Sequence, residues 1–209
     1  MPIGQGHVGP TVYDYRDGRC WFPDGRSVPL NPNIGVLGGL PAAGATHNGT
    51  CGPHGGNWDC GDHGPGAVAF FRAQCDGAGL AFGDVHWAMG DGEVEGQGVE
   101  GAAELHLRLH RVRQPIRGQW PWLIRDNQIM ALGADESFKQ AVHLAYEQLI
   151  SVVEDLMGLQ RRAIQDAIGP AGHVRLCQCC CPMLTVRCTL PLELLGLSES
   201  TLLKRLIEP

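Results

Sequence analysis

The sequence has few lysines, few serines and no long apolar run, and each scarcity excludes a class of protein. Its only lysines are Lys139 and Lys204, and none of its five serines lies in a glycine-rich elbow. Hydrolysis by a serine or cysteine that a lysine activates is therefore disfavoured. The G-x-S-x-G, G-x-x-x-x-G-K-[ST] and H-E-x-x-H motifs are also absent, so metal-assisted chemistry is the better expectation for an enzyme.

Several partners and compartments are disfavoured in the same way. No segment approaches the roughly 20 apolar residues of a transmembrane helix. The start, MPIGQGHVGP, lacks the basic and apolar regions of a signal peptide, and nine cysteines is an odd number for disulfides. The formal net charge of −6 provides no basic face for nucleic acid. We therefore expect a cytoplasmic protein with free thiols, and neither a nucleic acid nor a membrane as a partner.

Glycine and proline are plentiful, at 30 and 14 residues, beside an ordinary hydrophobic content of 44%. Many turns favour strands over a helical bundle. An alternation of Leu105, Leu107 and Leu109 with polar residues predicts a half-buried strand over residues 102–112. Other short apolar runs predict strands within residues 12–40, 67–74, 79–89, 174–181 and 184–190.

The helical pattern is confined to the C-terminal half. Apolar side chains recur with a helical period from Phe138 to Leu156, and Asp135 is the expected N-cap. A shorter helix over residues 160–170 would end at Gly169 and Pro170. We expect one mixed α+β domain over residues 1–209: a β-rich sandwich or barrel-like core, two adjacent helices, and a C-terminal helical appendage over residues 197–208.

Residues 83–96, GDVHWAMGDGEVEG, place four acidic side chains and a histidine among glycines. Asp84 and His86 are two residues apart, so on a strand both side chains point to one face, as a pair of metal ligands requires. Asp91 and Glu93 follow in a tight turn. A carboxylate near a metal can bind it or act as a general base toward water.

A second polar cluster, HGGNWDC, carries His54, Asn57 and Asp59 around two glycines. Each residue alone is more simply explained as part of a turn that caps a strand. Two such clusters, each interrupted by a tryptophan, Trp58 or Trp87, are better explained by one shared site, because exposed turns seldom need an indole.

The segments NPNIGVLGGLP, PHGGNWDC and GDVHWAMGDGEVEG, the last followed by Glu100, resemble the acetamidase/formamidase family. The family pattern runs from P-x-x-G-V-x-G through G-G-N-x-D to G-D-x-H-x-x-x-G-D-G-E. The similarity covers roughly residues 13–191. It implies hydrolysis of a short amide to a carboxylate and ammonia, with a bound divalent metal that is usually assigned as zinc.

The residues that match these motifs receive roles in a hypothetical mechanism. Asp59, Asp84 and His86 would hold the metal, with His54 as a fourth candidate ligand. Glu93 would carry the proton, with Asp91 as the alternative base, and Asn57 would donate to the developing oxyanion. Three apolar residues would line a small, dry substrate pocket: Trp58, Trp87 and Met89.

The sequence also departs from the family. Members carry a substantial N-terminal portion, whereas here about a dozen residues, His7 among them, precede the region of similarity. Either the site is complete without that portion, or another chain supplies it, or activity has been lost. We also expect the chain to form a homo-oligomer. The run CQCCCP replaces a usually aliphatic stretch. Its spacing fits neither a zinc site nor an iron–sulfur cluster, so buried free thiols are the favoured interpretation.

Two other functions stay open at this point. The chain could be a non-catalytic or accessory member of the family. It could also be a cupin-like metal-binding β protein, because Asp84, His86 and Glu93 loosely match cupin ligand spacing, although cupins normally place two histidines at the first two positions. An assay for ammonia release separates these functions from an amidase.

Overall fold

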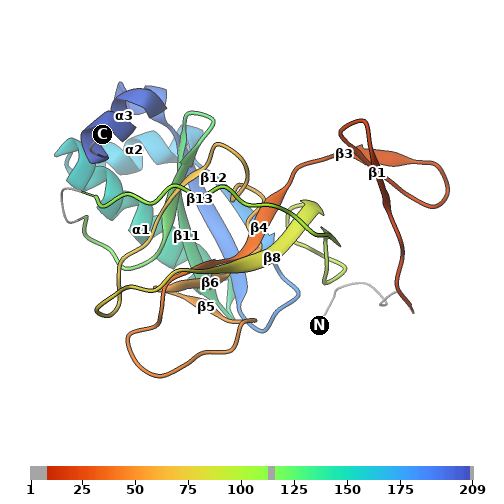
Figure 1. Ribbon diagram of the computed structural model, residues 1–209. Helices are drawn as coiled ribbons and strands as arrows, with labels where there is room; N and C mark the ends of the chain where they lie inside the picture. Colours follow the sequence, from red (N-terminus) through yellow and green to blue (C-terminus); the bar gives the residue numbers. More distant parts are fainter. Residues whose placement is uncertain (1–8, 113–115, 208–209) are drawn as a thin grey trace.

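The computed structural model describes residues 9–112 and 116–207. Its strands pair antiparallel in three sheets, and its three α-helices lie in the C-terminal half, which confirms the predicted mixed α+β class. A small sheet near the N-terminus projects from the rest of the molecule (Figure 1). That sheet has the order β1-β2-β3, with β1 (Asp14–Arg16), β2 (Arg19–Trp21) and β3 (Ser27–Pro29).

Two five-stranded sheets form the body of the protein. The first has the order β12-β13-β11-β10-β7, and the second has the order β5-β6-β4-β8-β9. The first consists of β7 (Val68–Phe70), β10 (Trp122–Arg125), β11 (Gln128–Asp135), β12 (His173–Gln178) and β13 (Leu184–Pro191). The second consists of β4 (Asn33–Gly38), β5 (Cys51–Gly52), β6 (Gly55–Asn57), β8 (Ala81–Ala88) and β9 (Val99–Glu100).

The helices cover one face of the first sheet, and the second sheet lies toward its other face (Figure 1). Helix α1 (Phe138–Met157) packs on β11 and β13, beside α2 (Arg161–Ala171) and α3 (Glu199–Leu206). Successive side chains of β11 therefore enter different cores. Ile129 and Ala131 join the core under the helices, while Met130 and Leu132 join a second core with residues that flank β6.

The prediction of a strand over residues 102–112 is wrong. This segment is extended but pairs with no strand of the described chain, apart from one bridge between Val112 and Ile207. Leu107 and Leu109 are 43% and 73% exposed. Period-two alternation predicts which side chains share a face, but a strand also needs a neighbour to pair with.

The ends of several elements also differ from expectation. The N-cap of α1 is Ser137, because Asp135 still belongs to β11 and its carboxylate accepts a bond from Ser137 N. Helix α2 continues through Gly169 and Pro170, and it ends where Gly172 N bonds to Ile168 O. The predicted strand over residues 174–181 stops at Gln178, so Cys179, Cys180 and Cys181 lie in a turn.

The expected C-terminal helix is present, and Ser198 caps it. The Ser198 hydroxyl accepts a hydrogen bond from Thr201 N, and Leu202 and Leu206 enter the core under the helices. Within the described residues, none of the helices combines the length and the apolar character that crossing a bilayer would require.

Candidate metal centre

Three of the four expected metal ligands converge. One ligand atom from each of Asp59, Asp84 and His86 can be chosen so that all three atoms lie within 4.8 Å of one another. Asp84 and His86 come from β8, and Asp59 follows β6, on the other side of β4 in the same sheet. The spacing is suited to a single ion bound by carboxylate and imidazole ligands.

Gly35 on β4 forms the floor of this cluster. A Cβ at this position would lie 2.5 Å from Asp59 Oδ1, 2.6 Å from Asp84 Oδ2 and 2.8 Å from His86 Cε1. The Gly35 carbonyl also accepts bonds from Trp58 N and Asp59 N, at 3.0 and 3.1 Å. The absence of a side chain therefore lets three ligands from two neighbouring strands approach one another.

The acidic residues of the site share an uncommon backbone conformation. Asp59, Asp84 and Glu93 have φ angles of 45°, 58° and 42°, in the left-handed region that L-residues seldom adopt. Each such residue costs roughly 1–2 kcal/mol. Three of them around one point indicate that the fold tolerates strain in order to direct carboxylates toward that point, from the buried Asp59 and Glu93 and from the exposed Asp84, as is common at functional sites.

Buried neighbours orient the ring of His86. Its Nδ1 lies 3.2 Å from Asn33 Oδ1, an acceptor that favours the tautomer with a proton on Nδ1 and a free lone pair on Nε2. Nε2 lies 3.8 Å from Asp84 Oδ1 and 3.6 Å from Glu93 Oε1. A histidine held in this way is prepared to bind a metal through Nε2.

The electrostatics of the site favour a cation. In the described part of the chain, no arginine or lysine forms an ion pair with Asp59, Asp84 or Glu93. Burial, followed by the charges of Glu93 and Asp84, raises the pKa of Asp59 to about 8, and burial raises the pKa of Glu93. Among the described residues, the buried Asp59 Oδ1 has no hydrogen-bond partner. A divalent ion would supply both the missing partner and the missing positive charge, so the residues fit a metal.

Asn57 and Glu93 flank the three ligands. Asn57 Nδ2 donates to Asp59 Oδ2 at 2.8 Å and to Cys181 Sγ at 3.5 Å, which engages both hydrogens of its amide. In this arrangement Asn57 holds Asp59 and has no hydrogen for an oxyanion. Glu93 is 7% exposed, and its Oε2 accepts a bond from the Cys180 thiol.

A groove of about 360 Å³ leads to Asp84 and Asn57. Its remaining lining combines small, apolar and amide side chains: Val36, Asn48, Gly49, Ala81, Phe82 and Gly83. None of the three residues expected to line the substrate pocket contributes to it. The groove provides a route from solvent to the acidic cluster.

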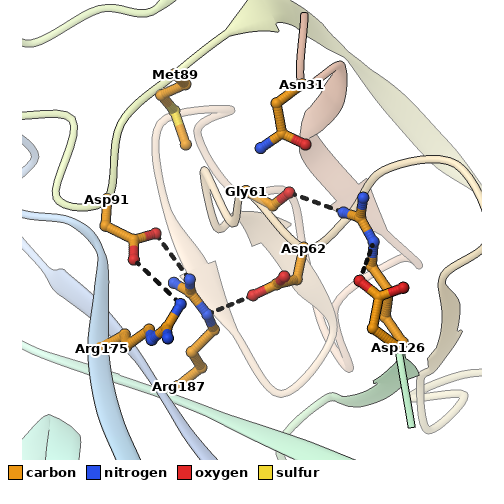
Figure 2. Close-up of a pocket in the computed structure, with 9 residues that line it drawn as sticks. Asn31, Gly61, Asp62, Met89, Asp91, Asp126, Arg175 and Arg187 are labelled. Atoms are coloured by element: carbon orange, nitrogen blue, oxygen red, sulfur yellow. Dashed lines mark hydrogen bonds and ion pairs between the residues drawn. The ribbon is translucent and has the colours of Figure 1, made fainter. Parts of the chain in front are cut away.

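Two expected site residues lie in a different pocket, which Figure 2 shows. Met89 and Asp91 line this polar space of about 370 Å³ together with the buried Arg187. Arg187 Nη2 is 2.7 Å from Asp91 Oδ1, and its Nε is 2.5 Å from Asp62 Oδ2. Asp91 is therefore paired with an arginine and does not join the acidic cluster.

The side chains of Trp58 and Trp87 pack elsewhere, and His54 is not among the residues that converge. Trp58 is fully buried in the second core and packs edge-on against Trp120. Trp87 lies near Tyr15 and donates to Ala102 O. His54 lies in the turn between β5 and β6 and is half-buried. His7 lies outside the described residues.

Sequence reasoning missed several residues that build the site. Gly35 carried a usable signal, because an isolated glycine inside a strand often marks a close approach. Asn33 pairs with His86 across β4 and β8, a register that a single sequence does not reveal. The contacts of Cys180 and Cys181 join segments more than 80 residues apart and had no local signal.

Comparison with known proteins identifies the family. The sequence pattern of the Acetamidase/Formamidase family matches residues 40–145, just over half of the chain. The chain therefore belongs to the Acetamidase/Formamidase family. No curated protein matches the chain.

Three solved structures are similar over 88% of the chain. They are an acetamidase from Bacillus halodurans (28% identity, TM-score 0.76), a predicted acetamidase/formamidase from Thermoanaerobacter tengcongensis (28%, 0.75) and an acetamidase from Yersinia enterocolitica (27%, 0.77). The matched regions cover 63%, 62% and 55% of those chains. The chain thus spans less than two thirds of the length of each.

Proposed function

We propose that this protein is a metal-dependent amidase that hydrolyses a short linear amide to a carboxylate and ammonia. The observation that carries the proposal is the convergence of Asp59, Asp84 and His86 beside the buried carboxylate of Glu93, in a member of this family. Amide hydrolysis needs a group that polarises the carbonyl, a proton acceptor, and access for a small substrate. The site has a candidate for each.

Asp59, Asp84 and His86 would hold the metal, and zinc fits their mixture of oxygen and nitrogen donors. A divalent ion there would polarise the amide carbonyl and lower the pKa of water. Asn33 fixes the ring of His86, and Asn57 fixes the carboxylate of Asp59. These contacts reduce the reorganisation that the ligands would otherwise undergo.

Glu93 moves the proton in this proposal. Its Oε1 faces the ligand cluster, so it accepts a proton from the attacking water and returns it to the leaving nitrogen. The substrate enters through the groove beside Asp84, where Val36 and Phe82 contact its acyl group and the Asn48 amide offers a polar contact. A groove of about 360 Å³ has room for a small amide.

The test is ammonia release by the purified chain loaded with Zn²⁺ or Co²⁺ and supplied with formamide, acetamide or propionamide. We expect turnover of at least one amide. We expect the His86→Ala variant to lose both turnover and metal while it stays folded. The exposed His106→Ala variant is the control and should behave like the unmodified protein. If the loaded protein releases no ammonia from any of these amides, the accessory, non-catalytic function replaces this proposal.

A further inference from the structure

The turn that holds Cys179, Cys180 and Cys181 connects β12 to β13 and lies against the turn that carries Glu93. Cys179 N donates to Gly92 O at 2.9 Å, and Gly92 N donates to Cys177 O at 3.0 Å. The Cys179 thiol donates to the same Gly92 carbonyl. The two turns are therefore fixed relative to each other by backbone bonds.

A buried amide sets the shape of the cysteine turn. Gln178 is 1% exposed, and its Oε1 accepts bonds from Cys180 N and Cys181 N at 3.0 and 2.9 Å. Its Nε2 donates to Met183 O at 2.6 Å. The amide thus spans the interior of the turn, which fixes the directions in which the following thiols point.

The thiols of this turn contact the candidate metal centre. The Cys180 sulfur lies 3.3 Å from Glu93 Oε2, the nearer of two acceptors for its hydrogen, and 3.5 Å from Gln178 Oε1. Cys181 Sγ accepts from Asn57 Nδ2, which also holds Asp59. The second oxygen of Glu93, Oε1, is 3.6 Å from His86 Nε2. One oxygen of the carboxylate is thereby anchored, while the other faces the ligands.

We propose that Cys180 is a positioning residue, which holds Oε2 of Glu93 so that Oε1 points toward the metal ligands. This inference rests on the proton-carrying function proposed for Glu93. Burial and the charge of Glu93 raise the pKa of the Cys180 thiol, so the sulfur keeps the hydrogen that it donates. An aliphatic side chain would leave Glu93 Oε2 without this donor.

The first experiment compares Cys180→Ala with Cys180→Ser in the metal-loaded full chain. We expect the alanine variant to lose about tenfold in kcat, with KM, metal content and Tm nearly unchanged. The serine variant, whose hydroxyl can donate to Glu93, should recover to within about threefold of the original kcat. Cys75→Ala, in the loop between β7 and β8, is the control and should change nothing. Unchanged kcat in Cys180→Ala would overturn the inference, and so would equal losses in both variants together with a lower Tm.

The second experiment does not depend on amide hydrolysis. Iodoacetamide labelling of each cysteine is followed by mass spectrometry in the unmodified protein and in Glu93→Gln. Glu93→Gln keeps an acceptor oxygen but removes the negative charge beside the thiol, so a larger fraction of Cys180 should be thiolate; labelling of Cys180 should accelerate by about tenfold, and Cys75 should be unaffected. Equal Cys180 rates in the two proteins would overturn the contact. If the protein hydrolyses no amide, the proposed function fails and the kinetic comparison cannot be made. The labelling rates still test the contact between the Cys180 thiol and the Glu93 carboxylate.

Discussion

Glu93 is the residue on which the proposed chemistry depends most directly. It is buried, has a left-handed backbone conformation, and presents one oxygen to His86 and the other to Cys180. We expect Glu93→Gln to lower kcat by at least about a hundredfold, because the amide keeps the shape but cannot accept a proton. Metal content and Tm should stay near those of the unmodified protein. A variant that loses its metal would show that Glu93 is a ligand.

Gly35 allows a test of the metal centre that leaves every ligand in place. Gly35→Ala places a Cβ within 2.8 Å of atoms of all three ligands, so at least one must move. Disturbed support of ligands typically costs about 10- to 100-fold in metal affinity. The control is Gly83→Ala on the neighbouring β8, where a Cβ would meet nothing within 4 Å. Titration with Zn²⁺ measures both variants, and an unchanged affinity in Gly35→Ala would contradict this placement of the metal.

The buried His63 should make the stability of the folded protein depend on pH. Its ring is buried with no hydrogen-bond partner in the described chain, and burial lowers its pKa to about 4. In the unfolded chain this histidine binds a proton near pH 6.5, whereas in the folded chain it stays neutral until about pH 4. The free energy of unfolding therefore has its full value above pH 6.5 and decreases as the pH falls toward 4. The loss amounts to about 3 kcal/mol of unfolding free energy.

The variants that test this contribution are His63→Leu and, as the exposed control, His106→Gln. Urea unfolding between pH 4 and pH 7 should show a shallower pH dependence for His63→Leu. His106→Gln should keep the original dependence, because the His106 side chain is 84% exposed. Parallel pH curves for His63→Leu and the unmodified protein would assign the acid sensitivity to other groups.

At the scale of elements, the sequence could predict contacts that a single strand or helix creates. Asp84 and His86 could be paired because strand periodicity alone places them on one face, and α1 could be found from its apolar stripe. Asp59 joins them only through the order β6-β4-β8 within the sheet. Glu93 joins through the bonds of its turn to β12. Such pairings link distant segments, and composition and periodicity carry no information about them.

The packing of α1 on β11 depends on Gly133. A Cβ at Gly133 would lie 2.5 Å from Ala145 N in α1, and the helix backbone cannot give way as a flexible side chain could. We expect Gly133→Ala to destabilise the protein by about 1–3 kcal/mol. Gly169→Ala is the matched control, because its Cβ would meet nothing within 4 Å inside α2, and it should stabilise by up to about 1 kcal/mol. Chemical unfolding measures both, and equal effects would contradict the close packing.

At the scale of the whole molecule, the extended segment over residues 102–111 is an exposed part of the surface that carries apolar side chains. Figure 1 shows it crossing the face of the molecule as an irregular chain, and no strand of the described residues pairs with it. Leu107 and Leu109 are largely exposed on it, at 43% and 73%. Unpaired backbone groups beside alternating apolar side chains favour association with another extended chain.

We therefore expect the protein to form a dimer or larger oligomer, in which this segment pairs antiparallel with its copy around a twofold axis. Replacing both Leu107 and Leu109 by glutamate should shift the assembly to monomers, because like charges would face each other across the pair. Leu159→Glu, at an exposed leucine between α1 and α2, is the control and should leave the assembly intact. Sedimentation velocity at micromolar concentration distinguishes these states. A stable monomer of the unmodified chain would show that the segment remains solvated, and an oligomer insensitive to the double replacement would place the interface elsewhere.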